Sequence, residues 1–197
     1  MVTTTQDLSL TPAARAVLDA ASQLFYDRGI NSVGVDAIAK EAGVTKKTLY
    51  DQFGSKAALV VAYLSERDQN YRAWVEQEIE EEDGADRVLA VFDALNSWMD
   101  AHSPKGCPFV HAHGELLGSP DHPAHEVIRA EKAWERELFA ELAGDVGCRE
   151  PVALAAQLTS LLEGATVLRS ISEVPDAFVE SRRAAGALVA AQAAPPR

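Results

Sequence analysis

Apolar residues recur at spacings of three and four along almost the whole chain of 197 residues, which is the pattern of amphipathic α-helices. In the first such segment, Val17, Ala21, Leu24 and Phe25 fall on one helical face. No stretch shows the alternation of β-branched residues that is typical of a β-strand. The sequence therefore predicts an all-α fold of about nine helices. These cover residues 12–28, 35–42, 45–52, 55–82, 86–101, 109–117, 123–143, 150–171 and 175–193.

The composition argues against a disordered chain and against a membrane protein. Hydrophobic residues make up 47% of the chain and charged residues 24%, which is enough apolar material to offset the chain entropy lost on folding. The longest apolar runs, 57–64 and 184–191, have eight residues each, whereas a transmembrane helix needs about 20. The first residues lack a signal-peptide pattern. We therefore expect a soluble, cytoplasmic protein that makes no membrane contact.

The two cysteines, Cys107 and Cys148, lie far apart without a CxxC pairing. Neither a disulfide scaffold nor a structural zinc site is expected from them. Cys107 follows Gly106 at an expected helix start, where a thiolate is favoured. Two interpretations stay open for Cys107, a thiol that senses electrophiles or oxidants and a small packed side chain.

Charge is distributed unevenly along the chain. The formal net charge of −12 argues against a polyanionic partner, because phosphate neutralisation needs Lys and Arg. Residues 1–56 are nevertheless neutral, with six basic and six acidic residues, and the rest of the chain carries the whole excess. Any contact with nucleic acid must therefore come from the N-terminal part, and within it from Lys46, Lys47 and Lys56.

Residues 34–53 have the pattern of a helix-turn-helix, two short helices joined by a short turn that contains a glycine. Ala39 is small enough for the helices to cross closely, and Gly43 can take the left-handed conformation that ends the first helix. Val44 and Leu49 are expected to fill the wedge between the helices. The outer face of the second helix then carries polar side chains that can bind phosphates and bases. An ordinary αα-hairpin is the alternative interpretation.

A longer motif resembles the DNA-binding domain of the TetR family of bacterial transcriptional repressors. It reads Leu24-Phe25-(x)3-Gly29-Ile30, then Val35-(x)2-Ile38-Ala39-(x)3-Gly43-Val44-(x)4-Leu49-Tyr50-(x)2-Phe53-(x)2-Lys56-(x)2-Leu59. The resemblance implies a homodimer that binds a palindromic operator in double-stranded DNA and is controlled by a small-molecule effector. It divides the chain into a flexible arm at 1–10, a DNA-binding domain at 11–71, a ligand-binding and dimerisation domain at 72–193 and a frayed tail at 194–197.

The resemblance also implies which residues contact DNA. Thr45 and Lys46 would begin the recognition helix, Tyr50 would place its hydroxyl near a phosphate, and Lys56 would anchor a phosphate at the start of the fourth helix. The full set is Ser32, Gly34, Thr45, Lys46, Lys47, Thr48, Tyr50, Asp51, Gln52 and Lys56.

The sequence departs from the family pattern in two places, one at a single residue and one at a pair of residues. Gly34 stands where many members have a Thr or Ser that caps the second helix, so that backbone contact is either lost or supplied by Ser32. Asp51 and Gln52 replace an aromatic-His pair. Asp51 would accept a hydrogen bond from a cytosine or repel a phosphate, and Gln52 would read an adenine if it reaches the groove.

The five histidines and Cys107 lie close together in the sequence, between His102 and His125. Three interpretations stay open for them: metal sensing, hydrogen bonding to a ligand, and ordinary loop or pocket positions. His111 and His113 point to opposite sides of a helix and cannot share an ion. We therefore expect neither a metal site nor a cofactor.

Aromatic and polar residues of the C-terminal part suggest an effector pocket, with a filled core as the alternative. The expected pocket residues are Trp74, Trp98, His102, Cys107, Phe109, His111, His113, Glu115, Trp134 and Leu161. Two apolar stripes near the C-terminus suggest a four-helix dimer interface, with an intrachain core as the alternative. The expected interface residues are Leu154, Leu158, Leu161, Ala165, Leu168, Phe178, Arg182, Ala185 and Val189.

Together these patterns predict a ligand-responsive, sequence-specific transcriptional regulator, most simply a repressor released by its effector. An enzyme is not expected, because the sequence contains no GxSxG, P-loop, dinucleotide-binding or HExxH motif. Two alternatives remain, a helical protein-interaction module without specific DNA binding and a thiol- or metal-responsive form of the same regulator. The sequence does not indicate the effector, the operator or the regulated genes.

Overall fold

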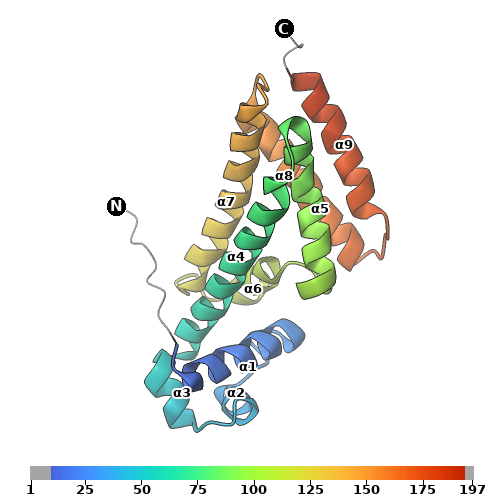
Figure 1. Ribbon diagram of the computed structural model, residues 1–197. Helices are drawn as coiled ribbons and strands as arrows, with labels where there is room; N and C mark the ends of the chain where they lie inside the picture. The colour runs from blue at the N-terminus through green and yellow to red at the C-terminus, as the bar shows by residue number, and fades with distance from the viewer. Residues whose placement is uncertain (1–9, 194–197) are drawn as a thin grey trace. The chain divides into compact units, whose positions relative to one another are not determined.

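The computed structural model describes residues 10–193, which form nine α-helices and no β-strand (Figure 1). The helices are α1 (Pro12–Arg28), α2 (Val35–Glu41), α3 (Lys46–Phe53), α4 (Lys56–Glu80), α5 (Gly84–His102), α6 (Pro108–Leu116), α7 (Ala124–Asp145), α8 (Pro151–Ser170) and α9 (Ala177–Gln192). The predicted all-α fold is confirmed, and the helix ends lie close to those expected. The predicted arm at 1–10, apart from Leu10, and the predicted tail at 194–197 lie outside the described residues.

The chain divides into two compact units. The first comprises the described residues up to Glu66 together with His111–Val127, and the second comprises Arg67–Val110 together with the residues from Ile128 onward. The expected division at residue 71 differs from this arrangement, because the segment 111–127 packs with the N-terminal helices. Helices α4, α6 and α7 each contribute residues to both units.

Local signals in the sequence explain the start and the packing of α1. The Thr11 hydroxyl accepts a hydrogen bond from the Ala14 amide at 3.1 Å, and Pro12 occupies the first turn, where it loses no hydrogen bond. The apolar face of α1 is buried against α2 and α3. Val17, Ile38 and Leu49 are fully buried there and form the centre of this three-helix packing.

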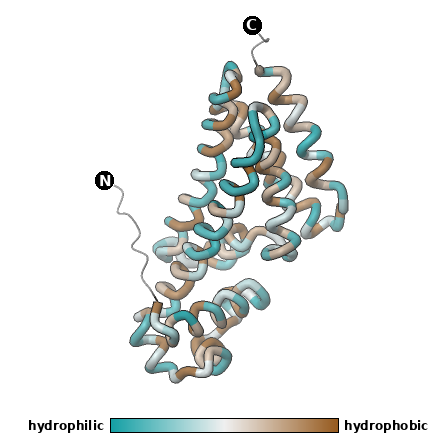
Figure 2. Tube along the Cα trace, viewed as in Figure 1, coloured by the Kyte–Doolittle hydropathy of each residue, from teal (hydrophilic) through white to brown (hydrophobic). Residues whose placement is uncertain are grey.

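The second unit is built around a larger apolar core. Phe92 of α5 and Phe139 of α7 are fully buried, with ring centroids 5.7 Å apart. Helix α9 packs along both α5 and α8. Hydrophobic and hydrophilic residues alternate along these helices, as expected for amphipathic segments (Figure 2).

Most of the stripe predicted to form a dimer interface belongs to this core instead. Leu154, Leu158, Ala165, Phe178, Ala185 and Val189 are all buried within the chain. Leu161 packs against the same core, and Arg182 forms an ion pair with Asp93 at 2.8 Å. Only Leu168 of the predicted set is an exposed apolar side chain. The interface prediction was therefore wrong for the buried residues, because a helical stripe shows that a face is covered but not by which chain.

Helix α8 is apolar on more than one face. Among the described helices, it alone is long and apolar enough to cross a membrane by length and composition. A third of its most apolar window is buried in the chain, while Val152, Val167 and Leu168 are exposed. Helix α8 therefore presents apolar side chains on its exposed side as well as on its buried side.

The assignment of Leu158 to the core gives a stability prediction. We expect Leu158→Ala to lower the free energy of unfolding by about 2–5 kcal/mol, because it leaves a cavity in a closely packed core. The matched control is Val152→Ala on the same helix, at a residue that is 73% exposed, with an expected effect of about 0.5 kcal/mol or less. Urea denaturation followed by circular dichroism measures both. Similar small losses in the two variants would place Leu158 outside the core.

Candidate nucleic-acid interface and internal cavity

Helices α2 and α3 meet through a tight turn. Gly43 has a φ of 65°, a left-handed conformation that glycine adopts without strain. The Val44 amide donates to the Ala39 carbonyl at 2.9 Å, which closes the turn. The Thr45 hydroxyl then caps α3 by accepting from the Thr48 amide at 3.1 Å. Leu49 is fully buried, so the opposite face of α3 is presented to solvent.

Most of the predicted DNA-contacting residues lie on this exposed surface. Thr45, Lys46, Lys47, Tyr50, Asp51 and Gln52 are exposed, as are Ser32 and Gly34, while Thr48 and Lys56 are half-buried. The first turn of α3 thus presents a hydroxyl and two ammonium groups to solvent. Helix N-termini and lysines are both favourable for binding phosphate.

Both lysines of α3 are paired with carboxylates of the same unit. Lys46 lies 2.7 Å from Asp36 of α2, and Lys47 lies 2.6 Å from Asp51 one turn further along α3. The hydrogen bond that the Lys46 ammonium donates to the Asp36 carboxylate raises the pKa of Lys46. Asp51 therefore holds Lys47 on the surface of α3 in the absence of DNA.

Three other predicted contact residues are engaged within the protein. The Ser32 hydroxyl donates to the carbonyls of Arg28 and Gly29, so it does not replace the missing cap at Gly34. The Gln52 side chain accepts a hydrogen bond from the Thr11 hydroxyl at 2.8 Å. The Lys56 ammonium donates to the Ile30 carbonyl at 2.6 Å, and burial lowers its pKa.

Glu115 holds the turn between α1 and α2, a role that differs from the effector contact predicted for it. Its two carboxylate oxygens accept from the Ile30 amide at 2.9 Å and from the Asn31 amide at 2.7 Å. The Asn31 side chain donates back to the Glu115 carbonyl at 2.8 Å. Gly29 approaches so closely that an added Cβ would lie 3.0 Å from both carboxylate oxygens. The end of α6 is thereby fixed to the turn that leads into α2.

The histidines lie apart from the cavity described below, and most belong to the first unit. The His111 ring stacks on Tyr26 at 6.4 Å, and the His113 ring lies 6.0 Å from His125. Within residues 10–193, no group of three or more His, Cys, Asp or Glu side chains is placed to hold a metal ion.

The second unit contains a cavity of about 430 Å³, part of which is open to solvent. Its apolar wall consists of Tyr71, Leu95, Trp98, Met99, Pro108 and Phe109. Its polar wall consists of Arg67, Ser103, Cys107, Glu131, Lys132, Glu135, Glu163 and Thr166. The wall of the cavity thus combines an apolar side with a charged side.

Three of the predicted pocket residues, Trp98, Cys107 and Phe109, line this cavity. The others do not. The Trp74 indole donates to Ser97 at 3.1 Å, and the His102 ring packs on Trp98 at 4.2 Å. Trp134 packs edge-on against Tyr71, and Leu161 packs on the apolar core. The Cys107 thiol differs from the reactive thiol considered above, because burial raises its pKa to about 11.

Sequence reasoning missed the charged part of the cavity wall. Glu131, Glu135 and Phe139 lie on one face of α7, together with the buried residues Ile128 and Leu142. The sequence contained a signal for this wall, because two glutamates interrupt a helical stripe of apolar residues. A buried carboxylate must have a partner, and a face of this kind indicates a polar site inside the fold.

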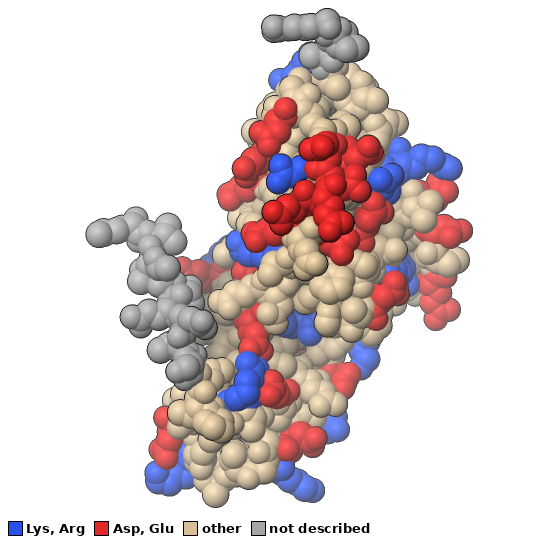
Figure 3. Space-filling model, viewed as in Figure 1, with Lys and Arg blue, Asp and Glu red and all other residues tan. Residues whose placement is uncertain are grey.

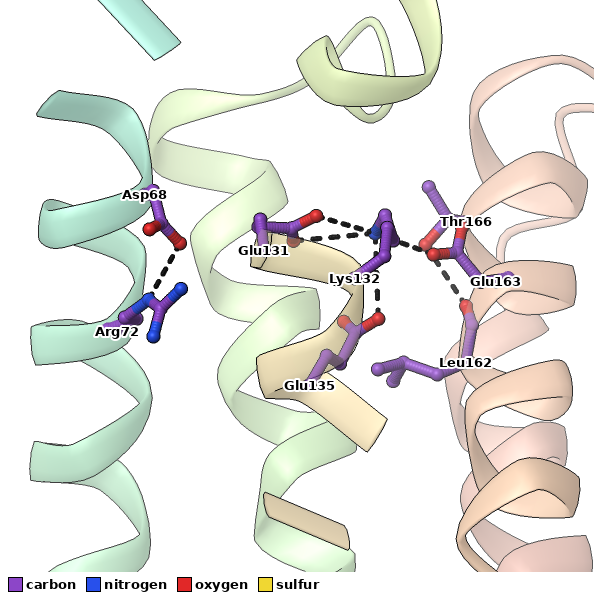
Figure 4. A network of polar contacts seen from close by, with 8 residues as sticks. All are labelled: Asp68, Arg72, Glu131, Lys132, Glu135, Leu162, Glu163 and Thr166. Atoms are coloured by element: carbon purple, nitrogen blue, oxygen red, sulfur yellow. Dashed lines mark hydrogen bonds and ion pairs between the residues drawn. The ribbon is translucent and has the colours of Figure 1, made fainter. Parts of the chain in front are cut away.

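Lys132 is the centre of this charged network (Figure 4). Its ammonium lies 2.6 Å from Glu163, 3.3 Å from Glu131 and 3.5 Å from Glu135. Burial raises the pKa of Glu131 to about 8 and also raises the pKa of Glu135. Burial opposes the charge on Lys132, but the surrounding carboxylates outweigh it and raise the pKa of the ammonium.

Two family models match the chain. The model of bacterial regulatory proteins of the tetR family matches residues 17–63, and that of the tetracyclin repressor-like C-terminal domain matches residues 84–185. The chain belongs to the TetR family. The resemblance found in the motif is thus confirmed. Because this is a family of regulators, the expectation that the chain is not an enzyme is confirmed as well.

Solved and curated proteins agree with this assignment. The chain is 30% identical to SCO4454, a TetR-family transcriptional regulator of Streptomyces coelicolor, with a TM-score of 0.85 over 93% of this chain and 97% of that one. It is 36% identical over 91 residues to the HTH-type transcriptional activator FasR of Mycolicibacterium smegmatis, and 48% identical over 52 residues to an uncharacterized HTH-type regulator of Mycobacterium tuberculosis. The alignments span 46% and 26% of this chain, and 41% and 26% of those relatives.

The Lys47 pair predicts an effect of Asp51 on DNA affinity. We expect Asp51→Asn to tighten binding to a duplex of random sequence by about two- to fivefold, because it removes a competitor for Lys47 and a charge that repels phosphate. Fluorescence anisotropy at two salt concentrations measures the affinity. The control is Asp93→Asn, which removes one exposed negative charge from the second unit. Equal gains in both variants would show an effect of net charge alone.

Proposed function

We propose that this chain is a transcriptional repressor that binds a palindromic operator as a homodimer and is released by a small-molecule effector in the cytoplasm. The observation that carries this proposal is the exposed first turn of α3, with Thr45, Lys46 and Lys47, on a buried three-helix scaffold. Such a helix fits the major groove of B-DNA. Family membership supports the same function.

The charge distribution supports DNA binding through the first unit only. In the second unit, acidic side chains gather over the end of α4 and the start of α5 (Figure 3). That region includes the run Glu80-Glu81-Glu82-Asp83. The first unit carries its lysines on α2, on α3 and at the first residue of α4. A duplex would meet cations on α3, and the acidic region would repel it.

The exposed apolar residues of α8 and α9 support a homodimer, on a different face from the one expected. Val167 and Leu168 are 48% and 43% exposed, and Ile171 and Val179 are 75% and 61% exposed. Two such helices from each protomer would form a four-helix interface. Covering this face in a second copy removes apolar surface from water, which stabilises the dimer.

Helix α6 is the proposed connection between effector and DNA. Its first residues, Pro108 and Phe109, line the cavity, and Glu115 near its end holds the Ile30 and Asn31 amides. A ligand that moves the start of α6 would change the position of Glu115. The turn before α2 would then move, and with it the helix-turn-helix.

The operator is tested by selecting bound duplexes from a random library. We expect an inverted repeat with half-sites about 10 base pairs apart or a multiple of that spacing. Lys47→Ala should weaken binding and reduce the salt slope by about 0.9, the contribution of one phosphate contact. The control is Lys105→Ala, at an exposed lysine of the second unit. The absence of any enriched sequence would contradict the proposal and favour a protein-interaction module.

The dimer face is tested by Val167→Glu. We expect this variant to be monomeric at micromolar concentration in light scattering, because a charge would be buried in an apolar interface. The matched control is Val110→Glu, at a residue of α6 with nearly the same exposure, 49% against 48%. A Val167→Glu protein that remains a dimer would place the interface elsewhere.

A further inference from the structure

The cavity of the second unit holds more negative than positive charge. The carboxylates of Glu131, Glu135 and Glu163 surround a single ammonium, that of Lys132. Arg67 also lines the cavity, but its guanidinium donates to the His102 carbonyl at 2.8 Å and to the Ser103 hydroxyl at 2.6 Å. The wall of the cavity therefore carries three acidic and two basic side chains, and Lys132 contacts all three glutamates.

Two carboxylate oxygens in the cavity wall, Glu131 Oε2 and Glu163 Oε1, make no hydrogen bond among the described residues, and Glu131 is the more deeply buried of the two residues. Glu131 is 2% exposed, and its Oε2 atom has no hydrogen-bond partner among the described residues. The Lys132 ammonium lies 3.3 Å from this oxygen, but its short contact of 2.6 Å is to Glu163. A buried acceptor without a donor is costly unless a ligand or water supplies one. The position beside Glu131 is thus suited to a group that donates a hydrogen bond and carries positive charge.

The remaining wall of the cavity favours an aromatic or aliphatic body. Tyr71 and Trp98 are buried with ring centroids 5.7 Å apart, and Phe109 is buried beside them in the wall. Aromatic rings attract cations through their faces and exclude water from apolar groups. The apolar wall and the carboxylates together form an amphipathic site.

We propose that this cavity binds a small organic cation, a protonated amine or an amidine with an apolar body, whose charged nitrogen pairs with Glu131. The proposal rests on the proposed function, in which the cavity is the effector site. An organic anion would meet three glutamates, and a neutral ligand would leave Glu131 without a charged partner. A metal ion would compete with Lys132, whose ammonium already occupies the space between the carboxylates.

Binding of a cation is coupled to release of a proton. Burial raises the pKa of Glu131 to about 8, so this carboxyl holds a proton at pH 7. A bound cation stabilises the carboxylate, and the proton passes to the buffer. Affinity for the cation therefore rises from pH 6 to pH 8 and levels off above that.

Several titratable groups face Glu131, and their pKa values decide which groups change protonation state between pH 6 and pH 8. They are Arg67 and Tyr71 of α4, Cys107 before α6, Lys132 and Glu135 of α7 and Glu163 of α8; the α5 residues in the wall are not titratable. Burial raises the pKa of Tyr71 further above 10 and that of Cys107 to about 11, and the carboxylates raise that of Lys132. These three groups stay protonated from pH 6 to pH 8. Glu131 titrates near the upper end of this range, because burial raises its pKa to about 8.

The test compares three probes with one apolar body, namely 3-phenylpropan-1-amine, 3-phenylpropan-1-ol and 3-phenylpropanoate. Binding to the full chain is followed by titration calorimetry and by tryptophan fluorescence, to which Trp98 in the cavity wall contributes. We expect the amine to bind at least about tenfold more tightly than the alcohol or the carboxylate at pH 8, a difference typical of a paired buried charge. We expect its affinity to fall by about tenfold per pH unit well below pH 8 if one proton is released.

Glu131→Gln should abolish both the preference for the amine and its pH dependence. Its matched control is Glu137→Gln, at an exposed residue of the same helix, which should change neither. The comparison of the three probes on the unaltered chain needs no variant, so it decides the proposal even if Glu131→Gln fails to fold. Equal or tighter binding of the alcohol or the carboxylate would overturn the inference.

Operator binding by the same preparation separates this inference from the proposed function. If the chain selects an inverted repeat but does not prefer the amine, the cation site is wrong and the regulator stands. If no sequence is selected, the proposed function fails whatever the cavity binds. If the amine also releases the selected duplex, the two proposals are supported together.

Discussion

The ammonium of Lys132 makes the interior of the second unit possible. Three glutamates stand at the cavity wall, and two of them are almost completely buried. Without the ammonium, burying these carboxylates would cost several kcal/mol each, and the helices α7 and α8 that carry them could not pack around the cavity. An apolar core would be more stable than this arrangement. The polar cluster is therefore better explained by binding than by folding.

Glu115 imposes a comparable constraint on the first unit. Its carboxylate accepts hydrogen bonds from two backbone amides in the turn that follows α1. Lys56 adds a contact to the Ile30 carbonyl from the start of α4. The turn before α2 is thus held by polar contacts from α6 and α4, in addition to the burial of Ile30 and Val33. A turn fixed in this way can respond to movement of α6.

The sequence predicted the helices and the helix-turn-helix because both depend on neighbouring residues. The caps at Thr11 and Thr45 and the break at Gly43 are local signals, and all three are present in the structure. The dimer face and the cavity depend on which helix packs on which. Periodicity indicated that Leu158 is buried, but not that its own chain buries it. The aromatic residues that suggested a pocket did not indicate Glu131 and Glu135. The role of Glu115 depends on a contact 85 residues away in the sequence from Ile30.

The pairing of the α3 lysines bears on specificity. Asp36 and Asp51 hold Lys46 and Lys47 at their surface positions before DNA arrives. Each contact with a phosphate must then replace an existing ion pair, which lowers the affinity for any duplex alike. Base contacts are not subject to this cost, so a larger share of the binding free energy comes from sequence readout. In a chain with a net charge of −12, the proposed binding of an operator would therefore depend on base contacts more than on general attraction to DNA.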